Sequence, residues 1–91
     1  MELWKAAEEA RAQRELLDKQ VQVKEGHIVL NATPENGLAD YNIALIRCDT
    51  PAKLLGWIRH LTEKTWLTMD MLDRFISEAC RENKIEIKHD A

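Results

Sequence analysis

The sequence holds little cysteine, glycine or proline: two, three and two residues among 91. Cys48 and Cys80 are too few for the disulfide framework of small secreted domains, and they lack the close pairing of zinc or redox motifs. Gly26, Gly37 and Gly56 lie far apart, so the sequence has no glycine-rich phosphate loop. We therefore expect two reduced, mostly buried thiols and no cofactor.

Clustered positive charge and long apolar runs are also missing. The chain has 13 basic and 16 acidic residues, a net charge of −3. Binding of nucleic acid relies on an excess of Lys and Arg, so we do not expect nucleic acid as a partner. No apolar run is long enough to span a membrane, and the N-terminus has no signal-peptide core. These absences predict a cytoplasmic protein without membrane association.

No catalytic signature stands out either. The three histidines are not spaced as metal ligands, and the one serine, Ser77, lies in a stretch of helical periodicity. Neighbouring carboxylates lie on the surfaces of expected helices, where exposure to solvent accounts for their charge without a catalytic role. A thiol–imidazole pair of Cys48 and His60 is an alternative that no flanking motif supports. We therefore expect a protein that is not an enzyme and has no metal site.

Residues 2–20 are rich in helix formers, with opposite charges three and four positions apart. Their apolar positions alternate four- and three-residue steps, as along one seam of a coiled coil. Arg14 interrupts this row, and the alanines of the row bury little area. The members of the row are Leu3, Ala7, Ala10, Leu17 and Val21. We expect an N-terminal helix over residues 1–24 that packs weakly within its own domain.

Three later stretches have the pattern of strands. Residues 27–30 and 41–46 are apolar and β-branched, and a loop with Asn36-Gly37 separates them. Residues 84–88 alternate strictly, which predicts an edge strand with Ile85 and Ile87 facing the core. In an alternative pairing, residues 21–23 form a hairpin with residues 28–30. Periodicity does not separate these choices.

Two helices are marked by their first residues. Thr50 with Pro51 predicts a helix over residues 51–63, and Thr68 predicts a second over 68–82, ending with Asn83 as a C-terminal cap. We predict a single α+β domain over residues 1–91, with a core over 27–91. Its small three-stranded antiparallel or mixed sheet is packed by two helices, and a long N-terminal helix precedes it.

The tryptophans bear most on function. We expect Trp57 and Trp66 to pack together between the two helices, whereas Trp4 lies on the helix with the weak seam. Indole rings are enriched in binding hot spots. The leading hypothesis is a small module that binds another protein, with a homodimer through the N-terminal helix as one form. The candidate contact residues are Leu3, Trp4, Arg11, Arg14, Leu17 and Trp66.

A DNA-binding regulator is the alternative, because two successive helices can form a helix-turn-helix. The would-be recognition helix, residues 68–82, is net acidic, which disfavours a place beside phosphates.

A resemblance to other small proteins rests on four short segments: Tyr41–Leu45, Arg47–Pro51, Leu55–Ile58 and Lys64–Thr68. Together they resemble a pattern in small uncharacterised proteins of phages and bacterial mobile elements. The resemblance brings no established activity. It implies a small binder that modulates host machinery or inhibits a defence system, which is an analogy of source and size.

Overall fold

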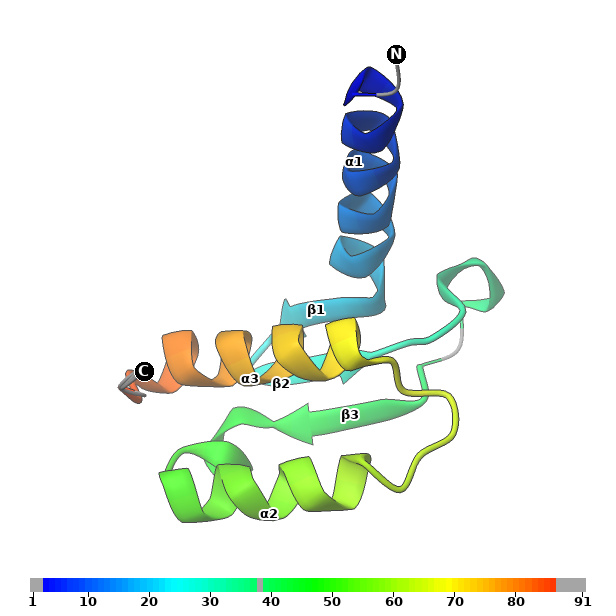
Figure 1. The fold of residues 1–91 in the computed structure, drawn as a ribbon. Helices are drawn as coiled ribbons and strands as arrows, with labels where there is room; N and C mark the ends of the chain where they lie inside the picture. The colour runs from blue at the N-terminus through cyan, green and yellow to red at the C-terminus, as the bar shows by residue number, and fades with distance from the viewer. Residues whose placement is uncertain (1–2, 38, 87–91) are drawn as a thin grey trace.

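A computed structural model describes residues 3–37 and 39–86, with the side chains of the first helix described from Ala7 onward. It confirms the α+β class (Figure 1). The three strands form one antiparallel sheet in the order β1-β2-β3. The elements are α1 (Leu3–Gln20), β1 (Val21–Lys24), β2 (His27–Leu30), the 3₁₀ helix η1 (Pro34–Asn36), β3 (Tyr41–Ala44), the 3₁₀ helix η2 (Leu45–Cys48), α2 (Pro51–Leu61) and α3 (Met69–Asn83).

The first two strands form the hairpin that the sequence offered only as an alternative. Val21 pairs with Leu30 and Lys24 with His27 across a two-residue turn. Glu25 and Gly26 both have positive φ, 49° and 78°, as the twist of a tight hairpin requires. The expectation of a helix over residues 1–24 is therefore wrong at its end: α1 stops at Gln20, and the next four residues are β1.

The prediction of a strand over residues 84–88 is wrong for residues 84–86, the part that the structure describes. Lys84 adopts a left-handed conformation (φ 56°), and its N–H donates to the carbonyl of Cys80. Lys84, rather than Asn83, is thus the C-terminal cap of α3. Ile85 and Glu86 join no strand, although Ile85 packs against the core. Residues 87 and 88 lie outside the described part. The hairpin supplies the third strand instead.

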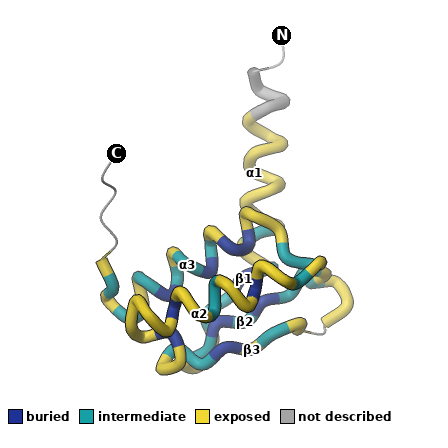
Figure 2. The backbone as a smooth tube through the Cα atoms, turned by 60° about the horizontal axis from the view of Figure 1, so that its bottom comes forward, coloured by how far each residue is buried: buried dark blue, intermediate teal, exposed yellow. Residues whose placement is uncertain are grey.

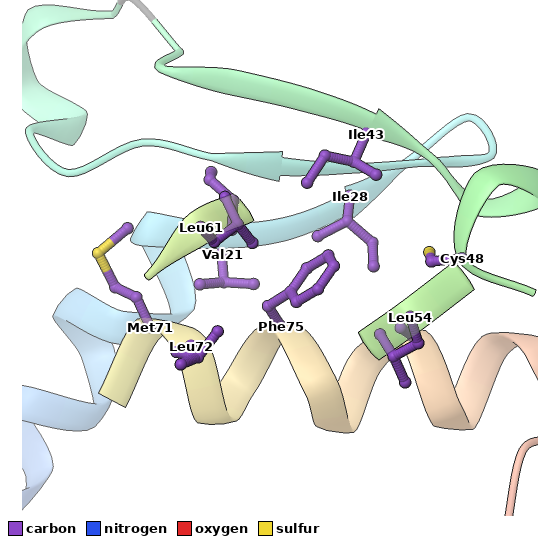
Figure 3. Close-up of a cluster of buried hydrophobic side chains, with 11 residues drawn as sticks. Val21, Ile28, Ile43, Cys48, Leu54, Leu61, Met71, Leu72 and Phe75 are labelled. Atoms are coloured by element: carbon purple, nitrogen blue, oxygen red, sulfur yellow. The ribbon is translucent and has the colours of Figure 1, made fainter. Parts of the chain in front are cut away.

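The core lies between one face of the sheet and the two later helices. Phe75 points from α3 toward the strands and is fully buried at the centre (Figure 3). Residues on the opposite face of the sheet are exposed or half-buried. The buried set is Val21, Ile28, Leu30, Ile43, Cys48, Leu54, Leu61, Met71, Leu72, Phe75 and Ala79.

Polar contacts fix the ends of the helices. The Thr50 hydroxyl accepts from the Lys53 N–H at 3.2 Å, and the Thr68 hydroxyl accepts from Met71 at 3.0 Å, which confirms both predicted N-caps. At the other end of α3, the Asn83 amide nitrogen donates to the carbonyls of Leu45 and Cys48, both at 3.0 Å. This amide therefore ties α3 to η2. None of the helices in the described part has the length and apolar character needed to cross a bilayer.

Candidate protein-binding surface

Helix α1 projects from the rest of the molecule. Every residue from Ala7 to Leu16 is exposed, and Figure 2 shows this part of the helix extending beyond the layers of the body. Leu17 and Gln20, in the last turn, are half-buried. With 18 residues, α1 is about 27 Å long. Most of its surface is therefore free to meet a second molecule.

The base of α1 is held by several different contacts. Leu17 packs against the core. The Gln20 side chain donates to the Ala32 carbonyl at 3.1 Å, and the Gln20 carbonyl accepts from the Asn31 N–H at 2.8 Å. Arg74 of α3 donates to the Asp18 carboxylate at 2.7 Å, an exposed ion pair worth about 0–1 kcal/mol. The base is fixed, whereas every residue from Ala7 to Leu16 is exposed.

An isolated helix of this length is only marginally stable in water, since most helices gain their stability from a packed apolar face. Residues 7–16 are all exposed, so this stretch has no buried apolar face within the described chain. A second helix laid along α1 would supply it. The small side chains of Ala7 and Ala10 would let that helix approach closely.

The structure separates the six predicted contact residues. Arg11 and Arg14 are exposed on α1, and Leu17 is half-buried at its base. The side chains of Leu3 and Trp4 lie outside the described part of the chain, so the proposed contact through Trp4 stays a prediction.

A small groove lies where α1 meets the start of α3. It has a volume of about 180 Å³ and is lined by Gln13, Leu16, Leu17, Gln20, Thr68 and Asp70. Two large apolar side chains stand exposed here: Leu16 is 46% exposed on the groove wall, and Met69, next to Thr68, is 80% exposed. Sequence reasoning missed both. Leu16 lies outside the row of apolar seam positions. An apolar residue at a position with no expected core contact is the signal that could have identified it.

Trp66 belongs to a different cluster. It lies between α2 and α3, and its ring centre is 5.8 Å from that of Tyr41. Trp57 packs edge-on against the same tyrosine at 6.3 Å, so both indoles pack on β3. The Tyr41 hydroxyl lies 3.0 Å from Nε2 of His60, and the Lys64 ammonium lies 5.2 Å from the centre of the Tyr41 ring. Trp66 is thus half-buried in a stabilising aromatic cluster away from the α1 seam.

The cysteines do not have the surroundings of nucleophiles. Burial raises the pKa of the Cys48 thiol, and the negative charge of Asp49 and the nearby Cys80 raise it further. Burial also raises the pKa of Cys80. Both therefore stay protonated at neutral pH, the opposite of what thiolate attack needs. Residues 3–37 and 39–86 contain no cluster of three His, Cys, Asp or Glu side chains that could hold a metal ion.

Comparison of the chain with protein-family models, with curated proteins and with solved structures gives no match. A functional proposal therefore has to rest on α1 and the surfaces of the body.

Proposed function

We propose that this chain is a non-enzymatic protein-binding module whose docking element is α1. One observation carries the proposal: ten consecutive helical residues, 7–16, are exposed while the adjoining body has a complete core without them. Burying apolar area is the main source of helix stability in proteins. A partner that covers α1 would stabilise both the helix and the complex.

The chemistry of α1 favours an amphipathic helix as the partner element. Ala7 and Ala10 form a flat strip along the seam. Arg14 continues the same row and Arg11 lies beside it, and both can pair with acidic groups. At the base, Leu16 and Met69 offer apolar area to the end of that helix. A second copy of this chain is one such partner. The resemblance of segments within residues 41–68 to small phage proteins adds host or defence proteins as a partner class.

The first experiment uses two matched substitutions, Ala10→Arg and Ala12→Arg. Both alanines are exposed on α1, but positions two apart on a helix point to nearly opposite sides. Arginine is a good helix former, so neither change should unfold α1. We expect Ala10→Arg to abolish capture of a stoichiometric protein from bacterial lysate, and Ala12→Arg to leave capture intact.

The capture is repeated after nuclease treatment, and the mass of the purified protein is measured in solution. A dimer that Ala10→Arg converts to monomer would support self-association through α1. Equal capture by both variants would contradict the role of the seam. Partners lost after nuclease treatment would favour the DNA-binding regulator instead.

A further inference from the structure

Strand β3 forms one edge of the sheet and has unpaired backbone groups. The Leu45 N–H donates to the Gly26 carbonyl at 2.9 Å, and Ile28 stands opposite Ile43. Because antiparallel strands alternate the direction of their backbone groups, Tyr41 and Ile43 face β2, while Asn42 and Ala44 face away. The free side of β3 thus presents the N–H and C=O of Asn42 and the N–H of Ala44. The Ala44 carbonyl already accepts the first bond of η2.

A groove borders the end of β3 that leads into η2. Its volume is about 270 Å³, and its walls are His27, Asn42, Ile43, Ala44, Arg47 and Trp57. Trp57 reaches it from α2, so the lining combines an apolar ring with residues of β3. An added strand lies about 4.8 Å from its neighbour and turns alternate side chains to opposite faces. The groove therefore suits an extended chain that places an apolar side chain against Trp57.

A basic side chain lies near each end of β3. Arg47 is exposed beside Ala44, and Lys64 lies over the ring of Tyr41. Neither makes an ion pair within the described residues. Two acidic groups lie nearby: Asp49 is paired with Lys53 at 3.0 Å, and Asp40, which precedes β3, accepts from the Ala32 N–H at 2.8 Å.

From these observations we propose that β3 binds an extended acidic segment of another protein as a fourth strand, with a carboxylate of that segment at Arg47. Strand addition uses backbone bonds for affinity and side-chain pockets for specificity. This site is independent of the α1 surface. A second copy of β3 is disfavoured, because it would bring two sets of Arg47 and Lys64 together.

The opposite edge of the sheet serves as an internal control. The free groups of β1 belong to Val21 and Val23, by the same alternation. The groove beside them is larger, about 370 Å³, and its charged lining is balanced, with Asp18 and Glu78 against Lys24 and Arg81. The groove at β3, by contrast, has Arg47 and no acidic residue in its lining. An acidic segment should therefore choose β3 over β1.

The probe is the capped pentapeptide acetyl-Thr-Glu-Val-Glu-Val-amide, added to the full ¹⁵N-labelled chain and followed by NMR. We expect saturable shifts of the Asn42 and Ala44 amides and of the Trp57 indole, with Val21 and Val23 unchanged. Two control peptides should not bind: one with lysine for glutamate, and one with N-methyl groups on the peptide amides that would pair. Shifts centred on Val21 and Val23, or no saturable shift with the acidic peptide, would overturn the proposal.

Two variants test the chemistry of the site. Ala44→Pro removes one free N–H, and the φ of Ala44, −65°, already matches that of proline. We expect about tenfold weaker binding, because one backbone bond is lost and the ring fills the edge. Arg47→Glu should reverse the preference in favour of the lysine peptide.

Unchanged affinity in a folded Ala44→Pro protein would overturn strand addition, and the N-methyl peptide tests the same point should that variant not fold. Unchanged peptide preference in Arg47→Glu would overturn the charge argument. Concentration-dependent shifts of Asn42 and Ala44 without peptide would mean that a second copy occupies the edge, which also overturns the proposal.

Discussion

Helices α1 and α3, with 18 and 15 residues, differ in what covers them. Along α3, Met71, Leu72, Phe75 and Ala79 are buried at steps of one, three and four residues. Along α1, every residue from Ala7 to Leu16 is exposed. α3 gains its stability from the core, whereas α1 depends on intrinsic helix propensity and on whatever covers it. If α1 is the docking element, as we propose, folding and docking depend on different helices, and substitutions should separate the two roles.

The largest effect is expected for Phe75→Ala. This side chain is fully buried at the centre of the core, so its removal loses transfer free energy and leaves a cavity. The free energy of unfolding should fall by about 3–5 kcal/mol, as measured by urea denaturation. Leu16→Ala, a large apolar truncation on α1, is the control and should change it by less than about 1 kcal/mol. Equal losses would mean that α1 belongs to the cooperative core.

A smaller loss is expected for Asn83→Ala at the end of α3. Truncation leaves the carbonyls of Leu45 and Cys48 without this donor in a partly buried site. Unfolding free energy should fall by about 1–3 kcal/mol. Asn42→Ala, an exposed asparagine on β3, should be nearly neutral in the same denaturation series. If the two variants are equally stable, the link between α3 and η2 contributes nothing.

Lys84→Gly should increase stability. Lys84 holds a left-handed conformation, which strains any side chain with a Cβ but not glycine. We expect a gain of about 0.5–1 kcal/mol, seen as a higher melting temperature. The same replacement within α3, Ser77→Gly, should lower stability, because glycine is a poor residue in a helix interior. A loss at Lys84 would contradict the assigned cap.

The smallest effect on core stability is expected for Ala10→Pro. Proline should break α1 near its middle and reduce the far-ultraviolet helical signal. Because residues 7–16 are all exposed and none belongs to the buried core, the unfolding midpoint of the core should stay within error. Ser77→Pro, at an exposed position of α3, should unfold the protein. A large fall in midpoint for Ala10→Pro would show that α1 supports the body.

Local signals predicted the helices and their N-terminal caps, because Thr50 and Thr68 act on donors three residues away. The strands depended on distant partners and were harder to predict. Glu25 is an unusual residue for the left-handed turn position, so the hairpin was not obvious from its turn. The alternation in residues 84–88 indicated a strand. A short sequence pattern does not show, however, whether a sheet has a free edge with which that strand could pair.

The sequence predicted the candidate site only for residues whose exposure follows from their charge. Arg11 and Arg14 lie on a surface with many charges, and both are exposed. Trp66, predicted in the same contact set, lies in a separate cluster, because its packing on Tyr41 joins residues 25 positions apart. Leu16 and Met69 were missed for a similar reason. Their groove exists only once α1 and α3 are brought together.

Helix α1 passes into β1 without a linker, since Gln20 ends the helix and Val21 begins the strand. Mechanically, α1 is therefore a lever arm of about 27 Å attached to a four-residue edge strand. Figure 1 shows the arm standing across the direction of β1. A force applied at the far end of α1 would load the β1–β2 hydrogen bonds one after another rather than all together. Traction on the docked helix would thus peel the hairpin before it disturbed the contacts between α2 and α3.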